Sequence, residues 1–369
     1  MAGKSHRNEM TSPNDRINQL VRPEIRALQA YHVPDPGNLI KLDAMENPYP
    51  WPEWLLDELF DELRTVSLNR YPDPQATLLK QPLRMLMGVP DRAGVVLGNG
   101  SDELIQMIIQ SVAAPARVIM APEPTFVMYR QIATVSGLEF AGVPLRADFT
   151  LDAEVMLAAI DSQQPAVVFL AYPNNPTGNL FDGDAVEAII AKAPGLVVVD
   201  EAYAPFTDHS FLPAVPEAAN LLVLRTLSKM GFAGLRLGLL AGPGEWLEQI
   251  GKTRLPYNIG TLNQVTGAFA LRHYDVFVGQ ADSLRSDREE LFAGLLEMPG
   301  LTVFPSAANF ILFRSLLGRA DAIFTGLKSR GVLIKNLNGS APALADCLRV
   351  TVGQPEENAT FLAALQDSL

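Results

Sequence analysis

The sequence predicts an α/β protein with two unequal parts. One is a large domain with a mostly parallel, doubly wound sheet, and the other is a smaller α+β domain toward the C-terminal end. Short apolar runs alternate with helical patterns from about residue 95, polar clusters follow these runs, and the pattern changes after about residue 280. Such alternation is typical of parallel sheets that helices cover on both faces.

The first ~45 residues are predicted to form an arm, because Pro23, Pro34 and Pro36 interrupt any regular pattern. A short helix is expected within it, around Glu24–Ala30. We expect an N-terminal arm over residues 1–45, a large domain over 46–275 and a small domain over 276–369.

Apolar spacing and strand-length apolar runs predict the elements of the large domain. The expected helices are Trp54–Arg64, Glu103–Val112 and Asp184–Lys192. The expected strands are Val95–Leu97, Arg117–Met120, Ala166–Ala171, Leu196–Val199 and Leu221–Leu224. In the small domain we expect helices over Ser283–Leu295 and Ala320–Arg330, and strands over Thr302–Phe304, Phe310–Phe313, Val332–Lys335 and Cys347–Val352.

Composition excludes several classes of function. Of the 369 residues, 48% are hydrophobic and the net charge is −12, which indicates a globular protein and argues against nucleic-acid binding. The single cysteine, Cys347, permits neither an intramolecular disulfide nor a cysteine cluster, and the four histidines lack metal-ligand spacing, so we expect no metal site. The polar N-terminal residues and the absence of an apolar run near ~18 residues predict a cytoplasmic protein without a membrane span.

Polar clusters follow four of the predicted strands. They are Gly100-Ser-Asp102, Asn174-Asn175, Asp200 and Ser228-Lys229. Ligands of doubly wound sheets bind outside the carboxyl ends of the strands. The sequence therefore predicts that these side chains converge on one site.

Lys229 is the candidate nucleophile, although an ordinary surface lysine is the alternative. Gly231, Ala233 and Gly234 leave room for close approach of backbone or ligand. A partly buried lysine with a lowered pKa can form a Schiff base. Asp200 is either a turn or N-cap aspartate, or a carboxylate that faces a cation such as the protonated ring nitrogen of pyridoxal phosphate.

Other polar residues allow the same double interpretation. Asn174-Asn175-Pro-Thr-Gly178 could be only a tight turn, and Tyr203 only a core residue. Alternatively, Asn175 and Tyr203 hold a polar ligand atom. Ser101 could be an N-cap, or the segment Gly98–Glu103 could cradle a phosphate at the start of a helix. Thr226, Ser228 and Arg236 would add two hydroxyls and a guanidinium to that anion.

Taken in this order, the motifs Gly-Ser-Asp102, Asn-Asn-Pro-Thr-Gly178, Asp-Glu-Ala-Tyr203 and Ser-Lys229 resemble the fold-type I aminotransferases that use pyridoxal phosphate. Further segments resemble the histidinol-phosphate aminotransferases in particular: Arg22-Pro-Glu-Ile-Arg26, Ala30-Tyr-His-Val33, Leu42–Tyr49, Asn69-Arg-Tyr-Pro-Asp73, Thr226-Leu-Ser-Lys229 and Leu348–Gly353. This resemblance covers essentially the whole chain after about residue 15.

The resemblance implies a role for each candidate residue. Lys229 would bond to the cofactor and move the substrate proton, Asp200 would pair with the ring nitrogen, and Asn175 and Tyr203 would hold the phenolic oxygen. The cofactor phosphate would be surrounded by Gly100, Ser101, Asp102, Thr226, Ser228 and Arg236. Phe126 stands where the family often has a ring-stacking tyrosine, so stacking is kept but a phenol hydrogen bond is lost. Tyr71 matches a residue that reaches the phosphate of the partner subunit, which implies a homodimer with active sites at the interface.

The substrate contacts implied by the resemblance are Arg349 for an anionic group, Lys335 as a second cation, and Tyr31 and Asn47 nearby. The expected reaction is transfer of an amino group between L-histidinol phosphate and 2-oxoglutarate, as in histidine biosynthesis. Two related activities remain open: an aromatic or broad-range amino acid aminotransferase, and a decarboxylase of a phosphorylated amino acid. A non-enzymatic regulator is the second alternative, but the acidic chain offers no DNA-binding module.

Overall fold

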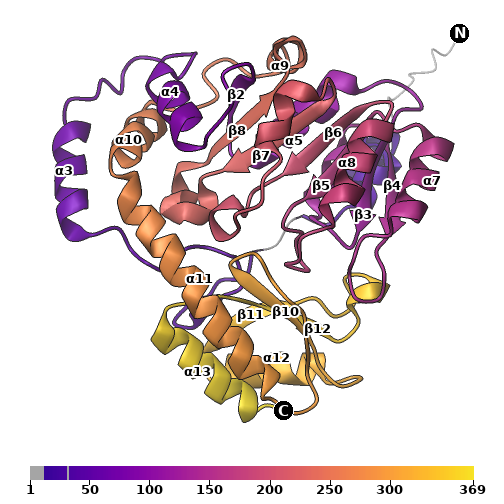
Figure 1. Cartoon of the computed structure of the whole chain (residues 1–369), viewed down its shortest axis with the longest axis vertical. Helices are drawn as coiled ribbons and strands as arrows, with labels where there is room; N and C mark the ends of the chain where they lie inside the picture. The colour runs from indigo at the N-terminus through magenta and orange to yellow at the C-terminus, as the bar shows by residue number, and fades with distance from the viewer. Residues whose placement is uncertain (1–11, 31–32) are drawn as a thin grey trace, which may run out of the picture.

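The computed structural model describes residues 12–30 and 33–369. Two bodies are visible in Figure 1, a larger one above that contains the main sheet and a smaller one below that contains a second sheet. The long helix α11 (Tyr274–Leu296) runs from the first body to the second. It begins nine residues before the predicted start at Ser283, because apolar residues Phe277 and Ala281 continue its buried face.

The large sheet has seven strands in the order β2-β8-β7-β6-β5-β3-β4. Their bounds are β2 Gly94–Asn99, β3 Val118–Glu123, β4 Glu139–Pro144, β5 Val167–Ala171, β6 Leu196–Asp200, β7 Leu221–Thr226 and β8 Leu237–Gly242. All neighbours pair in parallel except β8, which is antiparallel to both β2 and β7. The predicted α/β class and mostly parallel sheet are confirmed.

Sequence reasoning identified five of these strands and missed β4 and β8. β4 is an edge strand whose exposed and buried residues alternate, so it lacks a continuous apolar run. β8 is fully buried, but Gly238 and Gly242 interrupt its apolar pattern. A Cβ at Gly238 would lie 2.7 Å from the carbonyl carbon of Gly100, so this glycine is required by the close approach of the turn between β2 and α5.

Helices cover both faces of the large sheet, as expected for a doubly wound fold. Alternate residues of β6 show this directly, since Val198 packs in one core cluster and Val197 and Val199 pack in the other. The first cluster includes residues of α5 (Ser101–Val112), α6 (Met128–Val135) and α9 (Gly244–Gly251). The second includes residues of α3 (Glu53–Leu63), α4 (Thr77–Leu86), α7 (Ala153–Gln163), α8 (Gly183–Lys192) and α10 (Thr261–Arg272).

The small sheet has five strands in the order β1-β11-β12-β10-β9. They are β1 Ile40–Leu42, β9 Thr302–Val303, β10 Phe310–Arg314, β11 Val332–Asn336 and β12 Cys347–Thr351, accompanied by α12 (Ala320–Ser329) and α13 (Pro355–Gln366). β1 pairs in parallel with β11, so the end of the predicted arm supplies an edge strand to the small sheet. The remaining divisions between domains stay predictions.

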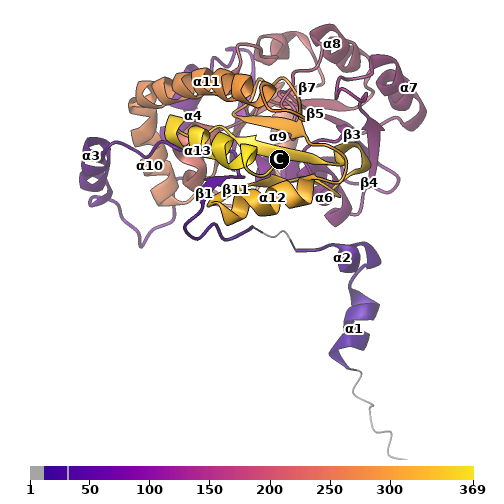
Figure 2. The ribbon, with the colours of Figure 1, turned by 90° about the horizontal axis from the view of Figure 1, so that it is seen from below.

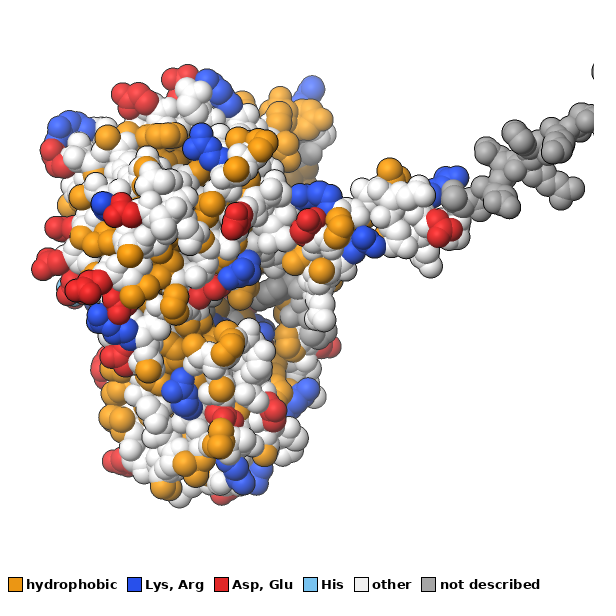
Figure 3. Space-filling view, turned by 90° about the vertical axis from the view of Figure 1, so that its right-hand side faces the viewer, with side chains coloured by type: hydrophobic (Ala, Val, Ile, Leu, Met, Phe, Trp, Pro, Cys, Tyr) orange, Lys and Arg blue, Asp and Glu red, His pale blue; other side chains and the backbone are white. Residues whose placement is uncertain are grey.

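The N-terminal helix α1 (Pro13–Leu20) projects away from both bodies (Figures 2 and 3), whereas α2 (Pro23–Ala27) contacts α6 of the large domain. The helix predicted over Glu24–Ala30 exists as α2 but ends at Ala27. Arg22 donates a hydrogen bond to the carbonyl oxygen of Val135 in α6, which joins the base of this arm to the large domain. Further out, Leu20 is 81% exposed.

Candidate active site

The carboxyl ends of β5, β6 and β7 lie side by side, because the register pairs Ala171 with Asp200 and Asp200 with Leu224. The polar residues that follow these strands therefore meet at one edge of the sheet, as the sequence predicted. The loop after β5 contributes Asn175, β6 ends in Asp200, and β7 leads into Lys229. The second body lies below this edge in Figure 1.

Asp200 is 4% exposed, and both of its carboxylate oxygens accept hydrogen bonds. The hydroxyl of Tyr129 donates to Oδ2 over 2.7 Å, and the backbone N–H of Ala202 donates to Oδ1 over 3.1 Å. Burial raises the pKa of Asp200 to about 6, and the bond from Tyr129 opposes that rise. In this carboxyl group, burial favours the neutral acid and the hydrogen bonds favour the ionised carboxylate.

Sequence reasoning did not single out Tyr129. The available signal was its position three residues after Phe126 in Pro124-Thr-Phe-Val-Met-Tyr129. The Tyr129 N–H donates to the carbonyl oxygen of Phe126 over 3.3 Å, which forms a turn at the start of α6. The two rings pack edge to face, with centroids 5.5 Å apart. Nothing in the sequence alone indicates that this turn brings the phenol to Asp200.

Asn175 connects the two bodies of the molecule through its side-chain amide. Its Nδ2 donates to the Tyr203 hydroxyl over 3.0 Å, and its Oδ1 accepts from Nη1 of Arg349 in β12. Nη2 of Arg349 also donates to the carbonyl oxygen of Asp43 over 3.1 Å. Arg349 is 6% exposed, so a buried guanidinium from the small sheet lies directly against the loop after β5.

Lys229 lies in a tight turn over Ser228–Phe232 that directly follows β7. Gly231 takes φ 93° within this turn, a conformation that favours glycine. The indole nitrogen of Trp51 donates to the Gly231 carbonyl over 2.9 Å and fixes the turn. Nζ of Lys229 lies 5.7 Å from the centre of the Tyr203 ring.

The pKa of Lys229 is lowered to about 8, first by burial and then by the positive charge of Arg349. The neutral form of this amine is therefore more populated near neutral pH than it is in an ordinary lysine. A neutral amine is the form that acts as a nucleophile or a base. The geometry is compatible with the expected reactive lysine, whose role stays a prediction.

At the start of α5 the structure forms a cradle suited to an anion. Gly100 is the N-cap with φ 82°, and α5 begins at Ser101, so the alternative interpretation of Ser101 as the N-cap is wrong. A Cβ at Gly100 would lie 2.6 Å from Nη2 of Arg236. The backbone of Gly100 and the Arg236 guanidinium therefore face each other at close range, where any side chain at Gly100 would intervene.

Hydroxyl groups and one carboxylate complete this cradle. The hydroxyl of Thr226 donates to that of Ser228 over 2.9 Å, and Nη1 of Arg236 lies 3.5 Å from the same Ser228 oxygen. Nη2 of Arg236 donates to Oδ2 of Asp102 over 3.2 Å. The pair is 44% and 42% exposed, respectively. Asp102 thus orients the guanidinium, which explains an acidic residue beside a predicted anion site.

The remaining predicted site residues lie at the border of the two bodies or outside it. Lys335 pairs with Arg349 across β11 and β12, so both side chains leave the same face of the small sheet. Nδ2 of Asn47 donates to Gln280 of α11 over 2.9 Å, and Tyr31 lies outside the described residues. Tyr71 is 80% exposed and stacks on Tyr257 with centroids 4.4 Å apart.

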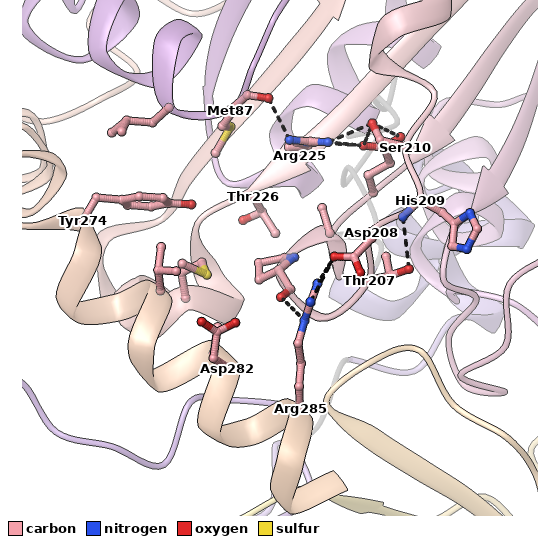
Figure 4. Close-up of a pocket in the computed structure, with 17 residues that line it drawn as sticks. Met87, Thr207, Asp208, His209, Ser210, Arg225, Thr226, Tyr274, Asp282 and Arg285 are labelled. Atoms are coloured by element: carbon pink, nitrogen blue, oxygen red, sulfur yellow. Dashed lines mark hydrogen bonds and ion pairs between the residues drawn. The ribbon is translucent and has the colours of Figure 1, made fainter. Parts of the chain in front are cut away.

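A cavity of about 320 Å³ lies beside the site, between the loop after β6, the end of α4 and α11 (Figure 4). Arg225 in its wall donates through Nη2 to Oε2 of the buried Glu201 over 2.7 Å and through Nη1 to the carbonyl of Met87 over 3.0 Å. Glu201 and Arg225 directly neighbour Asp200 and Thr226 in the sequence. This ion pair therefore braces the two strand ends that carry the site.

Among residues 12–30 and 33–369, no group of three or more histidine, cysteine, aspartate or glutamate side chains could hold a metal ion. Within the same described ranges, every helix is too short or too polar to cross a membrane.

Comparison with known proteins gives concordant results. A family model described as aminotransferase class I and II matches residues 37–365. Histidinol-phosphate aminotransferase 2 of Nitrosococcus oceani is 54% identical over 352 residues, covering 95% of this chain and 98% of the relative. Histidinol-phosphate aminotransferase of Chromobacterium violaceum is 53% identical over 350 residues, covering 95% and 98%. The structure of histidinol-phosphate aminotransferase from Sinorhizobium meliloti with pyridoxal-5'-phosphate has a TM-score of 0.82 at 24% identity, covering 94% of this chain and 96% of that one.

Proposed function

We propose that this chain, which belongs to the class I and II aminotransferase family, transfers an amino group between L-histidinol phosphate and 2-oxoglutarate. The products are imidazole acetol phosphate and L-glutamate, and histidine biosynthesis uses the reverse direction. The observation that carries this assignment is identity above one half, over nearly the full chain, to curated histidinol-phosphate aminotransferases of several bacteria. The enzyme uses pyridoxal 5'-phosphate, and a cytoplasmic location is part of the proposal.

The residues of the site fit this cofactor. Asp200 offers a buried carboxylate to the ring nitrogen, and the amide of Asn175 and the hydroxyl of Tyr203 offer hydrogen bonds to the phenolic oxygen. Phe126 packs edge-on against Tyr129 and would stack on the ring. The cradle formed by Gly100, Ser101, Asp102, Thr226, Ser228 and Arg236 would hold the phosphate.

When bound, pyridoxal phosphate supplies an electron sink for the carbon from which the substrate proton is removed. The protein would contribute Lys229, whose Nζ would hold the cofactor and whose free amine would accept and return this proton. Its lowered pKa of about 8 keeps the neutral, proton-accepting amine accessible near neutral pH.

Arg349 and Lys335 are proposed to hold the anionic group of each substrate in turn, the phosphate of histidinol phosphate and a carboxylate of glutamate. Both side chains leave one face of the small sheet, and an arginine can bind a phosphate or carboxylate through two parallel hydrogen bonds. Asn47 and Tyr31 are proposed to border the substrate. The amide of Asn47 lies near the Lys229 turn, because a Cβ at Gly231 would be 3.3 Å from its Nδ2.

A homodimer is proposed as the working form, with Tyr71 of each subunit reaching the cofactor phosphate of the other. The exposed Tyr71–Tyr257 stack supports this proposal, because a large aromatic pair of this kind is typical of interfaces. The dimer is tested by sedimentation, and the role of Tyr71 by cofactor affinity in Tyr71→Phe.

The proposed activity is tested by a half-reaction. The yellow holoenzyme is mixed with histidinol phosphate in the absence of any oxo acid, and the absorbance spectrum is followed. We expect loss of the band of the lysine-bound cofactor and a rise of the pyridoxamine phosphate band at micromolar substrate. Conversion with phenylalanine but not with histidinol phosphate would move the substrate to the aromatic class. Release of carbon dioxide from a phosphorylated amino acid, such as O-phosphothreonine, in the absence of an oxo acid would indicate a decarboxylase.

A further inference from the structure

The Asp200 carboxylate has a side-chain partner to which neither the sequence nor the comparisons assign a role. The hydroxyl of Tyr129 lies 2.7 Å from Oδ2. Tyr129 is 0% exposed, so water does not compete for this bond. A buried hydrogen bond to an ionised group is stronger than one between neutral groups.

The packing of Tyr129 fixes the direction of its hydroxyl. Its ring stacks on Phe169 of β5, with centroids 4.6 Å apart and planes 11° apart, and meets Phe126 edge to face at 84°. Aromatic contacts on two sides leave the ring little freedom to turn. The phenol oxygen is thus held toward the end of β6, where Asp200 lies.

The tyrosine is a donor that keeps its proton. Burial and the negative charge of Asp200 raise the pKa of Tyr129 well above its usual value. The hydroxyl therefore donates to Asp200 throughout the physiological pH range, and this bond favours the ionised carboxylate over the neutral acid.

Burial and two neighbouring carboxylates act in the opposite direction and favour the neutral acid form of Asp200. Burial, the largest cause, raises the pKa of Asp200, and Asp102 from α5 and Glu201 on the chain itself add to the rise. Tyr203 adds to the raised pKa of Tyr129. The hydrogen bond of Tyr129 and the Ala202 N–H are the contributions that lower the pKa of Asp200.

We propose that Tyr129 is a positioning residue that orients the Asp200 carboxylate and keeps it ionised for the ring nitrogen of the cofactor. This inference rests on the cofactor site of the proposed function. The turn Phe126–Tyr129 would then have two roles. Phe126 would stack on the ring of the cofactor, and Tyr129 would orient the Asp200 carboxylate.

The test is the affinity of the cofactor-stripped protein for pyridoxal phosphate, measured against pH by absorbance or fluorescence. Tyr129→Phe removes only the hydroxyl and keeps the ring that packs on Phe169. We expect roughly tenfold weaker binding at pH 6.5, with the loss on the acid side beginning roughly one pH unit higher than in the wild type. The direction follows because Asp200 without its donor takes up a proton more readily.

The matched control is Tyr274→Phe, which removes a partly buried phenol hydroxyl at the start of α11, in the wall of the cavity. The hydrogen bonds that the Asp200 carboxylate accepts come from Tyr129 and Ala202 instead. It should keep the wild-type pH dependence of binding. A double-mutant cycle with Asp200→Asn gives the second readout, because Tyr129→Phe should have little further effect once the carboxylate is absent.

A wild-type pH dependence in Tyr129→Phe would overturn the proposal, and so would an equal loss in the Asp200→Asn background. Either result would leave the tyrosine with a packing role alone. A wrong assignment of the substrate would not affect this test, because cofactor binding is measured without any substrate. If the wild-type holoenzyme did not react with histidinol phosphate, the assigned reaction would be wrong. The measured affinity for pyridoxal phosphate would be unaffected by that result.

Discussion

The proposed cofactor site has two ends that differ in how they hold charge: a ring end around Asp200 and a phosphate end around Arg236. At the ring end, Asp200 and Tyr129 are nearly or fully buried and bonded to each other. At the phosphate end, Arg236 and Asp102 are 44% and 42% exposed. Water and salt screen the second pair but hardly reach the first.

This difference in exposure separates two ways of holding a charged cofactor. The ionisation equilibria of the buried half are shifted, since burial raises the pKa of Asp200 to about 6 and lowers that of Lys229 to about 8. The exposed half instead consists of the backbone at the start of α5 and the partly exposed side chains of Arg236 and Asp102. Substitutions in the buried half should therefore change chemistry, whereas those at the phosphate end should mainly change cofactor affinity.

The largest effect is expected for Lys229→Ala, which removes the group proposed to accept and return the substrate proton. General acid–base catalysis contributes about 10²–10⁴-fold, so we expect the rate of the half-reaction to fall by at least about 10³-fold. Stopped-flow absorbance with histidinol phosphate measures this rate. Cofactor binding should persist, because the phosphate cradle and Asp200 are untouched.

Lys229→Arg is the matched variant for this prediction. It keeps the positive charge but does not release its proton at accessible pH. If the neutral amine of Lys229 is what matters, the arginine variant should be as inactive as the alanine variant. Recovery of activity in Lys229→Arg would instead mean that the charge alone suffices.

A smaller effect is expected for Arg349→Gln, which removes a buried cation that bridges the two bodies. Hydrogen bonds to charged groups contribute about 1.5–3 kcal/mol, so KM for histidinol phosphate should rise roughly 10- to 100-fold. Lys335→Gln is the matched control on the neighbouring strand and should raise KM only a few-fold, because its charge is partly exposed. A larger rise of KM in Lys335→Gln than in Arg349→Gln would mean that Lys335 is the main cation that binds the substrate.

Much of the buried half was predictable from the sequence, because its residues end strands with continuous apolar runs. Leu196–Asp200 and Leu221–Thr226 are strands in the structure, and their register places Asp200 beside Leu224, two residues before Thr226. An apolar run predicts a buried strand, and parallel strands end at one edge. These two rules are enough to predict which edge of the sheet carries the site.

Tyr129 and the end of the arm were not predictable in the same way. Tyr129 reaches Asp200 through a tertiary contact between residues 71 positions apart. β1 joins the small sheet through pairing with β11, although Ile40–Leu42 is only three residues long. Long-range pairing of this kind leaves no local pattern, because short strands gain their stability from the neighbour rather than from their own residues.

The smallest effect is expected at the phosphate end, in Arg236→Gln. Cofactor affinity should fall by roughly three- to tenfold at low ionic strength, and the loss should shrink at about 0.5 M salt, where the Debye length falls to a few ångströms. Asp102→Asn, which leaves the guanidinium in place, should change affinity by less than about threefold. Titration of the cofactor-stripped proteins at two salt concentrations measures both, with Tyr129→Phe as the buried counterpart whose loss should be insensitive to salt. A loss in Arg236→Gln that did not depend on salt would mean that this guanidinium acts through a fixed, dehydrated hydrogen bond to the phosphate. The two ends of the site would then hold charge in the same way.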